Sequence, residues 1–384
     1  MAFNYLSYLG TAEMSAEEIA AKMYGLACDF SMRSGSNQTT VSINGLGENL
    51  PEALAIVRDL AQNAVGNEGI LANLKADELK SRMDRKRNQR SCYSALVNYA
   101  SYGPEFIKKT SLSNEAMLAL TSDELLQKVK DVLANGCEVL YYGPASEAEV
   151  KETVTFDGSF TQLPERYPEM LQTPEPQVLL AQYDAKQLYY QQYSNRGEKM
   201  DVASEPVRTL FNEYFGGGMN AIVFQEMREA RGLAYSANAR LRAPYSADGT
   251  FSFSAFIATQ NDKLQIAVEA FDDIINNMPE SDAAFSVAKN ALEGRLRTQR
   301  TTGMSVLNAY RSCRRLGLDE PLDKAVFDAL PSLTLADVKA AQEQWVKGRT
   351  YTYAILGDIK DLDINFLKTL GPVREVSLED VFGY

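Results

Sequence analysis

An internal repeat constrains this chain more than any other feature of its sequence. The stretch LPEALAIVRDLAQNA begins at residue 50, and the similar stretch LQIAVEAFDDIINNM begins at residue 264, which is 214 positions later. Apolar residues fall at matching positions in both stretches, with the spacings of three and one that place them on one face of an amphipathic helix. The chain is therefore expected to contain two copies of one structural unit.

Other features repeat in the same order around these helices. Alternating apolar and polar residues predict strands at 39–45 and 250–256, upstream of the two helices. Downstream, residues 120–143 and 333–357 each begin with a threonine helix cap, continue as a helix, turn at a glycine and end as a strand. This shared order predicts two homologous α+β domains, each a mainly antiparallel sheet with helices packed on one face.

The two expected copies differ at their beginnings. We expect the first domain at residues 1–165, a proline-rich linker at residues 166–176 and the second domain at residues 177–384. The second copy opens with the strand-like segment KQLYYQQYS at 186–194, for which the first copy has no counterpart. The first domain is thus expected to lack its opening strands and to leave a sheet edge open. We expect this sequence to be the C-terminal portion of a longer chain, or the missing strands to come from elsewhere.

Candidate functional residues lie in the second copy, in the stretch YFGGGMNAIVFQEMREARGLAYS that begins at Tyr214. A phosphate-binding loop would continue with a lysine and a serine or threonine. This one continues with MNAIVFQ, so the glycines are expected to form a flexible lead-in to a helix. Gly232 is expected to end this helix and to place Tyr235 at the start of a strand. The residues expected in the site are Gly216, Gly217, Gly218, Arg228 and Tyr235.

Arg228 and Tyr235 also have simpler explanations. The arginine stands among other charged residues and could be one charge on a solvated helix face. The tyrosine could be a half-buried residue of a strand. The two residues are seven apart, and seven residues make about two helical turns, so a continuous helix would place both side chains on one side.

The stretch from Tyr214 closely resembles a segment typical of the pitrilysin-like zinc metallopeptidases, the family of insulin-degrading enzyme and the mitochondrial processing peptidase. Members of that family are built from repeated α+β domains, paired into two halves around a substrate chamber. One half carries the zinc motif H-x-x-E-H, and the other contributes an arginine and a tyrosine spaced as Arg228 and Tyr235 are here. The resemblance implies that this chain is the C-terminal, non-zinc half of such an enzyme.

The resemblance also implies roles for the site residues. A peptide carbonyl under attack develops negative charge on its oxygen, and a hydrogen-bond donor aimed at that oxygen lowers the barrier. Tyr235 would donate such a bond. Arg228 would bind a backbone carbonyl or the C-terminal carboxylate of a peptide substrate, because its guanidinium is permanently charged and fork-shaped. Gly216, Gly217 and Gly218 would lie near the substrate chamber.

Zinc is not expected on this chain. The chain has no histidine, and its four cysteines have no CxxC spacing, whereas zinc sites normally draw on these two residue types. The lack of histidine also excludes a Ser-His-Asp or Cys-His mechanism. In the first copy, the resemblance aligns the zinc motif with residues 1–5, MAFNY. Zinc is therefore expected on a complementary half that carries H-x-x-E-H, either upstream in the same polypeptide or in a separate subunit, and this chain alone is expected to be inactive.

Composition limits the other partners. The net charge of −12 argues against a nucleic-acid partner. No apolar run reaches the roughly 18 residues of a membrane span. The N-terminus has no basic region typical of a secretory signal, and the sequence leaves both cytoplasm and periplasm open. The alternative to a peptidase half is a non-catalytic scaffold or binding subunit derived from the same fold, and the presence of both Arg228 and Tyr235 favours the peptidase half.

Overall fold

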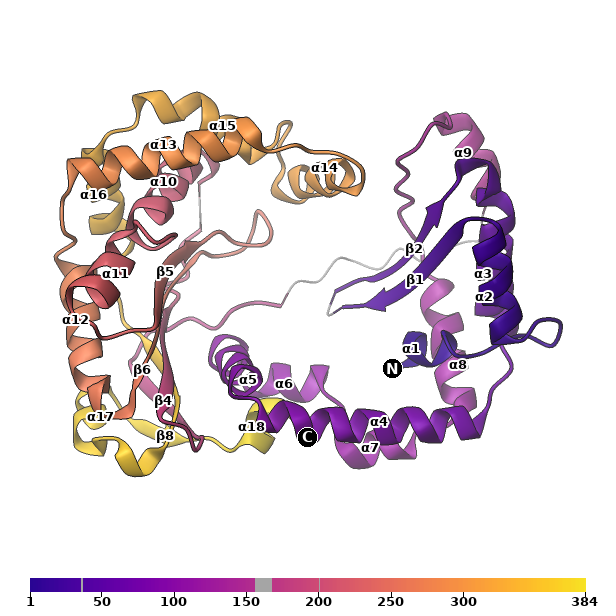
Figure 1. The fold of residues 1–384 in the computed structure, drawn as a ribbon, viewed down its shortest axis with the longest axis horizontal. Coiled ribbons are helices and arrows are strands. Elements are labelled where there is room, and N and C mark those ends of the chain that lie inside the picture. The colour runs from indigo at the N-terminus through magenta and orange to yellow at the C-terminus, as the bar shows by residue number, and fades with distance from the viewer. Residues whose placement is uncertain (36, 156–167, 200) are drawn as a thin grey trace. The chain divides into compact units, whose positions relative to one another are not determined.

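The chain folds into two compact units of mixed α+β structure (Figure 1). The computed structural model describes residues 1–35, 37–155, 168–199 and 201–384. The N-terminal unit comprises Met1–Asp84 and Leu112–Pro168, and the C-terminal unit comprises Arg85–Ser111 and Glu169–Tyr384.

The compact units and the expected repeat copies divide the chain differently. Residues 85–111 belong to the C-terminal unit, although they come from the middle of the expected first domain. The expected domain boundaries at residues 165 and 177 were drawn from the repeat and not from contacts, and they stay a prediction. Residues 166 and 167 of the expected linker lie outside the described residues.

The C-terminal unit contains a six-stranded sheet in the order β5-β6-β4-β7-β3-β8. Its strands are β3 (Gln177–Gln182), β4 (Gln187–Ser194), β5 (Ser236–Arg242), β6 (Ser252–Gln260), β7 (Thr352–Gly357) and β8 (Val373–Glu375). The pairings of β4 with β6, β4 with β7 and β5 with β6 are antiparallel, whereas β3 pairs in parallel with β7 and β8. The sheet is thus mainly antiparallel, as expected, with a parallel portion at one edge.

The main hydrophobic core lies between this sheet and a layer of helices. The helices of the C-terminal unit beyond residue 200 include α10 (Glu205–Phe215), α12 (Leu264–Asn276), α13 (Asp282–Thr298), α14 (Met304–Leu316), α15 (Leu322–Ala329), α16 (Leu335–Trp345) and α17 (Ile364–Leu370). On α12, the buried side chains include Leu264, Val268, Phe271 and Ile275, which belong to the apolar face predicted from the repeat. Burial of this stripe anchors the helix to the sheet.

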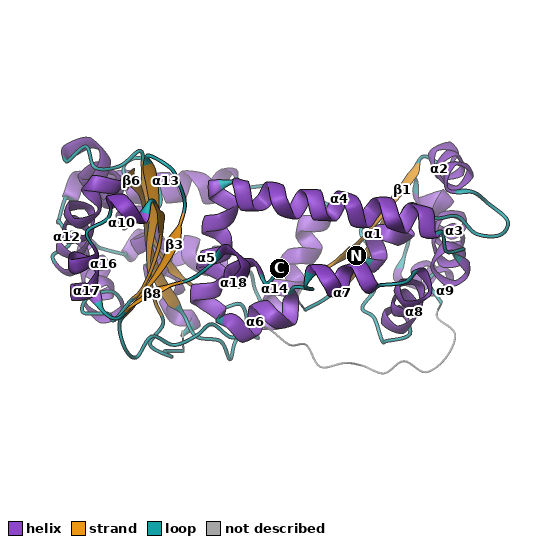
Figure 2. Ribbon diagram, turned by 90° about the horizontal axis from the view of Figure 1, so that it is seen from below, coloured by secondary structure: helices purple, strands orange, loops and turns teal. Residues whose placement is uncertain are grey.

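A second, smaller core covers the opposite face of the same sheet. Successive side chains along β3 and along β7 point to opposite faces of the sheet. Val178 and Ile355 therefore face the main core, while Leu179 and Leu356 face the smaller one. The smaller core is completed by α5 (Gln89–Tyr102) and α18 (Leu378–Phe382). Figure 2 shows the sheet edge-on, with α12, α16 and α17 on one side and α5 and α18 on the other. Helices were expected on one face of the sheet only. The helices of the main core match this expectation, but α5 covers the opposite face, which the repeat did not predict.

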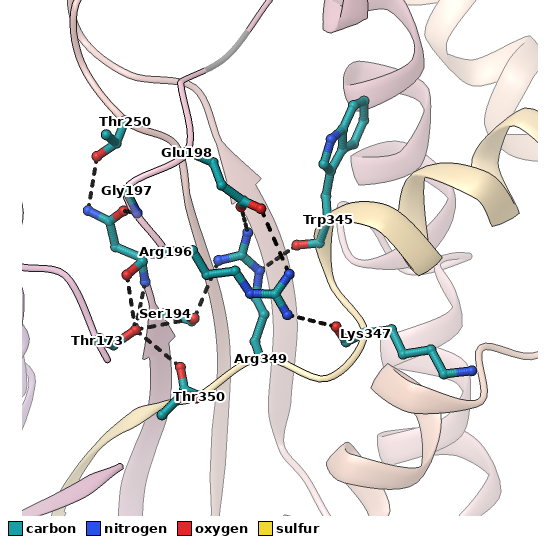
Figure 3. A network of polar contacts seen from close by, with 11 residues as sticks. Thr173, Ser194, Arg196, Gly197, Glu198, Thr250, Trp345, Lys347, Arg349 and Thr350 are labelled. Carbon is teal, nitrogen blue, oxygen red and sulfur yellow. Dashed lines mark hydrogen bonds and ion pairs between the residues drawn. The ribbon is translucent and has the colours of Figure 1, made fainter. Parts of the chain in front are cut away.

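A buried polar network joins the end of β4 to the turn between α16 and β7 (Figure 3). The Arg349 guanidinium donates hydrogen bonds to Glu198 Oε2 at 2.7 Å, to Ser194 Oγ at 3.3 Å and to the carbonyl oxygen of Trp345. Burial lowers the pKa of Arg349, and the Glu198 carboxylate opposes this shift. Because the guanidinium is paired and hydrogen-bonded, its burial is tolerated and the central strands β4 and β7 are held in register.

The N-terminal unit contains a two-stranded antiparallel sheet formed by β1 (Cys28–Ser34) and β2 (Thr39–Gly45). Its helices are α1 (Ala2–Leu6), α2 (Ala16–Gly25), α3 (Leu50–Asn63), α7 (Asn114–Ala119), α8 (Ser122–Leu133) and α9 (Glu147–Thr153). Helix α4 (Glu68–Arg87) begins in this unit, and α6 (Pro104–Thr110) belongs to the C-terminal unit.

The order of elements in the N-terminal unit follows that in the C-terminal unit. Short 3₁₀ turns at η1 (Gly47–Asn49) and η4 (Asn261–Lys263) precede α3 and α12, and each pair is 214 residues apart. Thr121 and Thr334 cap α8 and α16, as expected, and each cap is part of a capping box. Helix α1 packs on β1 and α8, as α10 packs on β5 and α16. These correspondences support the predicted repeat.

One predicted strand of the N-terminal unit is absent. The segment at 137–142 was expected to be a strand by its match to β7, but the structure gives it no strand conformation. In the C-terminal unit, β7 is held between β4 and β3. Among the described residues, the N-terminal unit has no equivalent of β3 or β4, so the segment has no partner for a hydrogen-bonded ladder.

In the described part of the chain, every helix is too short or too polar to cross a membrane.

Candidate functional site

The glycine run connects α10 to the sheet. Gly216 caps the C-terminus of α10, and a Cβ atom there would overlap the carbonyl oxygen of Ala239 on β5. A Cβ atom on Gly217 would lie 2.8 Å from the carbonyl oxygen of Asn212, whereas one on Gly218 would meet nothing within 4 Å. The first two glycines therefore allow close packing of the helix end. A role of the three glycines in substrate binding stays a prediction.

The helix that carries Arg228 has an unusual geometry. It begins as α11 (Ile222–Phe224) and continues as a π-helical turn, η3 (Gln225–Ala230). Such wide turns are rare and occur frequently at functional sites. Gly232 ends the helix, as expected, with a φ of 58°, which is a left-handed conformation that favours glycine. The backbone N–H of Leu233 donates to the carbonyl of Met227 at 2.9 Å, which closes the helix end.

The same turn places Tyr235 beside the sheet. The N–H of Tyr235 donates to the carbonyl of Ala258 on β6 at 3.2 Å, immediately before β5 begins. At the next residue of β6, the hydroxyl of Thr259 donates to the carbonyl of Leu233 at 2.6 Å. Met227 and Leu233 are buried in the main core. The backbone around the site is therefore anchored on both sides of the helix end.

The structure brings Arg228 and Tyr235 together. The guanidinium carbon of Arg228 lies 5.8 Å from the centre of the Tyr235 ring and 5.0 Å from the centre of the Phe224 ring. Both distances are within the range of cation–π interactions. The arginine side chain is 43% exposed, and Tyr235 is 75% exposed. The pair thus forms one solvent-facing surface with a cation and a phenol.

The polar atoms of the pair remain accessible to a ligand. Arg228 Nε lies 3.7 Å from Glu229 Oε1, which is a long, exposed ion pair. Among the described residues, neither the guanidinium of Arg228 nor the phenol of Tyr235 makes a side-chain hydrogen bond. The site therefore offers several N–H donors and one O–H donor in the same place.

Neighbouring Arg231 faces elsewhere. Its guanidinium forms ion pairs with Glu226 at 3.5 Å and with Asp273 on α12 at 3.3 Å.

Phe224 was not predicted as a site residue, although it stands four positions before Arg228, a spacing that places two helical side chains side by side. That spacing is the signal from which its contact with Arg228 could have been inferred.

The first copy carries no equivalent pair. The strand registers align Phe30 with Ala237, because Phe30 pairs with Ile43 and Ala237 pairs with Ile257. Counting back two positions places Cys28 opposite Tyr235, and Cys28 is buried. The exposed arginine–tyrosine pair is therefore specific to the C-terminal unit.

A metal site does not fit the residues that the structure describes. They contain no group of three or more histidine, cysteine, aspartate or glutamate side chains that could hold a metal ion. All four cysteines are free thiols, three of them buried and Cys137 exposed. At the positions aligned with the zinc motif, Phe3 and Tyr5 belong to the hydrophobic core of the N-terminal unit.

Sequence comparisons connect the chain to zinc proteases. Residues 119–292 match the family model described as the peptidase M16 inactive domain. An uncharacterized zinc protease from Rickettsia bellii (strain RML369-C) is 24% identical over 324 residues, which cover 80% of this chain and 74% of that protein. A second one, from Rickettsia felis, is 22% identical over 285 residues, covering 72% of this chain and 67% of that protein.

Solved structures share the fold. A peptidase M16 inactive domain from Pseudomonas fluorescens has a TM-score of 0.66 at 17% identity, covering 93% of this chain and 87% of that chain. The periplasmic protease PqqL from Escherichia coli has a TM-score of 0.66 at 12% identity, covering 93% of this chain and 40% of that chain. The sequence matches and the shared fold agree with the resemblance of this chain to the pitrilysin-like zinc metallopeptidases, and in particular to the M16 inactive domain.

Proposed function

We propose that this chain is the non-zinc half of a pitrilysin-like zinc metallopeptidase, closing the substrate chamber and supplying Arg228 and Tyr235 to bind and cleave peptides. The observation that carries the proposal is the stacking of the Arg228 guanidinium on the exposed Tyr235 ring. A cation and a phenol with unused donors are suited to the carbonyl and carboxylate oxygens of a peptide.

Tyr235 would act on the reacting carbonyl. Its O–H is a neutral donor, and its backbone N–H is already fixed to β6, so the ring projects from an anchored strand end. A donor held in place stabilises developing negative charge without reorganising, which is the basis of oxyanion stabilisation. Zinc on the complementary half would supply the Lewis acid of the reaction.

Arg228 would position the peptide. The rings of Phe224 and Tyr235 contact its guanidinium. They leave the edge of the fork, where its N–H donors point, open to a carboxylate or a backbone carbonyl. This side chain is expected to influence substrate affinity more than the chemical step.

The complementary half with the H-x-x-E-H motif is the expected partner. PqqL, of which this chain covers 40%, is a longer chain with the same fold over the shared part. This favours an arrangement in which the two halves form one polypeptide, and a separate subunit is the other possibility. Peptides are the expected substrates. The alternative proposal is a scaffold or binding subunit without catalysis.

Replacing one oxygen tests the proposed function. In the enzyme assembled with its complementary half, Tyr235→Phe removes one donor and little volume, so the turnover rate should fall by about 10²- to 10³-fold. Zinc content and thermal unfolding should stay at the parent values, because the substitution lies on an exposed ring.

Tyr245→Phe is the matched control. Tyr245 is also exposed and also stacked against an arginine, Arg315, but it lies in the loop between β5 and β6. The control should cleave peptides at the parent rate. If the Tyr235→Phe enzyme also cleaves peptides at the parent rate, the exposed pair is structural and the result favours the scaffold alternative.

A further inference from the structure

A pocket opens between helices of the C-terminal unit, away from the Arg228–Tyr235 pair along the chain. It has a volume of about 560 Å³ and is lined mainly by the end of α4 and by α5, α6 and α18. Figures 1 and 2 both show α6 and α18 beside α5. The volume is within the range of about 300–1,000 Å³ that is typical of small-molecule sites. All of the lining residues belong to the C-terminal unit, so the pocket lies within one compact body.

The side of α5 that lines the pocket is polar. Cys92 and Leu96 lie on the side of this helix that packs in the smaller core against the sheet. Ser91, Ser94 and Asn98 follow one another at spacings of three and four, which places them on another side, along the pocket. A helix face that packs on other helices is normally apolar. This face instead leaves room and presents hydrogen-bonding groups.

The wall formed by α6 and α18 is mainly apolar. Phe106 and Ile107 line the pocket from α6, and Val381 and Phe382 line it from α18. The two phenylalanines are only partly buried, so their rings can cover an apolar part of a ligand. A cavity with one apolar wall and a few convergent polar groups has the usual composition of a small-molecule site.

The charge in the pocket is positive. Two cations, Arg85 and Arg90, line it, and no carboxylate does so among the described residues. The chain as a whole is acidic, with 51 acidic against 39 basic residues. The side chain of Arg90 forms no hydrogen bond or ion pair with the described residues, so its donors are available to a ligand. Helix α5 begins here with Asn88 as its N-cap, and the positive end of the helix dipole also favours an anion.

The serine hydroxyls of α5 are arranged as acceptors. The hydroxyl of Ser94 donates to the carbonyl of Arg90 at 2.9 Å, and that of Ser91 donates to Asn88 Oδ1 at 3.2 Å. Because each hydroxyl hydrogen is already used, the two oxygens can only accept a hydrogen bond from a ligand. The side-chain amide of Asn98 makes no hydrogen bond with the described residues and offers both donors and an acceptor.

We propose that this pocket binds a small organic anion that carries both hydroxyl groups and a ring. Its phosphate or carboxylate lies at Arg85 and Arg90, because guanidinium groups bind both kinds of anion through paired hydrogen bonds. Its hydroxyl groups donate to Ser91 and Ser94. Its ring packs against Phe106. The proposal does not depend on the proposed peptidase role.

Isothermal titration calorimetry on the full chain tests the proposal with three matched glycosides. Nitrophenyl glucuronide carries a carboxylate, a phosphorylated nitrophenyl glucoside carries a phosphate, and the unmodified nitrophenyl glucoside carries neither. At least one charged glycoside should bind at one site per chain, about tenfold or more tightly than the uncharged one. The comparison of the two charged glycosides distinguishes a phosphate ligand from a carboxylate ligand. Inorganic phosphate, which has no ring and no sugar hydroxyls, should bind more weakly than the tighter charged glycoside.

A pair of arginine variants locates the anion. Arg90→Gln removes one cation of the pocket and should weaken binding of the charged glycoside by about tenfold, with little change for the uncharged one. Arg87→Gln is the matched control, because Arg87 is also exposed and is three positions away but does not line the pocket. Its affinity should stay within about twofold of the parent value. Since both side chains are exposed, both variants should unfold at the parent temperature without ligand.

A third variant tests the recognition of hydroxyl groups. Asn98→Leu removes the amide with little change in size, and should weaken binding of all three glycosides by about three- to tenfold. Binding of inorganic phosphate should be unchanged, because the arginines remain.

Three results would overturn the proposal. Equal affinity for the charged and uncharged glycosides would mean that the pocket does not recognise an anion. An equal loss of affinity in Arg87→Gln and Arg90→Gln would mean that the anion responds to surface charge in general. Inorganic phosphate that binds as tightly as the charged glycosides, with no effect of Asn98→Leu, would mean that the hydroxyl groups and the ring are not recognised.

Discussion

At Arg228, weak interactions hold a strongly charged group in an exposed position. A cation–π contact at an exposed site contributes about 0.5–1 kcal/mol, and Arg228 has two such contacts, with Phe224 and Tyr235. The exposed ion pair with Glu229 contributes about 0–1 kcal/mol. A bidentate carboxylate is a stronger partner than any of these. The guanidinium is therefore oriented by its neighbours but not saturated by them, which suits a group that binds and releases substrate.

Substitutions at Arg228 should separate binding from chemistry. In the assembled enzyme, Arg228→Ala should raise KM by about tenfold or more with a smaller change in kcat, because it removes a group that contacts the substrate before and during reaction. Arg228→Lys should recover only part of this loss, since an ammonium lacks the planar fork. Steady-state kinetics on one fluorogenic peptide measure both constants.

Arg231→Ala is the control for this series, because Arg231 is on the same helix but pairs with Glu226 and Asp273. Its kinetic constants should match those of the parent. A kcat loss at Arg228→Ala with unchanged KM would contradict the binding role and move Arg228 to the chemical step.

At the level of elements, the site depends on how closely α10 approaches β5. Gly216 permits that approach, because any side chain there would overlap the backbone of Ala239. Since β5 begins immediately after Tyr235, a shift of this contact would also displace the phenol. The sequence expectation of a flexible lead-in therefore misses a packing constraint, which arises from a strand more than twenty residues away along the chain.

Two alanine substitutions in the glycine run should behave differently. Gly216→Ala forces the helix end away from β5 and should lower the free energy of unfolding by about 1–3 kcal/mol, the range for overpacking. Gly218→Ala has open space and should leave stability within about 0.5 kcal/mol of the parent or raise it slightly. Urea unfolding followed by circular dichroism measures both. Equal destabilisation by the two substitutions would refute the packing role of Gly216.

Elements whose partners are close in sequence could be predicted, and those whose partners are distant could not. The amphipathic stripe of α12 and the helix caps of Thr121 and Thr334 are local patterns, and the structure confirms them. The strand expected at 137–142 is wrong, because a strand needs neighbours and its sequence records only its own propensity. The position of α5 on the far face of the sheet likewise follows from long-range packing that no local pattern contains.

At the scale of the whole molecule, the two units share an order of elements but differ in their sheets and in the residues that they expose. The C-terminal unit has a complete six-stranded sheet and the exposed Arg228–Tyr235 pair. The described N-terminal unit has two strands, and the positions aligned with the zinc motif belong to its core. Converting that region into a metal site would require polar ligands where Tyr5 is now fully buried. Zinc on another half therefore stays a prediction that rests on the resemblance to zinc peptidases.

The metal content of the purified chain tests this division of roles. The chain has no histidine, and its described residues contain no cluster of three or more metal-ligating side chains. Because zinc sites are normally built from three or four such ligands, elemental analysis after dialysis should find well under one zinc per chain, and fluorogenic peptides should remain uncleaved.

Titration with the complementary half should then produce peptidase activity that rises to a plateau at one chain per half, with about one zinc per assembled pair. The matched control is the same titration with the complementary half carrying Gln in place of the motif glutamate, which should assemble without activity. One tightly held zinc in the isolated chain, or cleavage by the chain alone, would show that the non-zinc role is wrong.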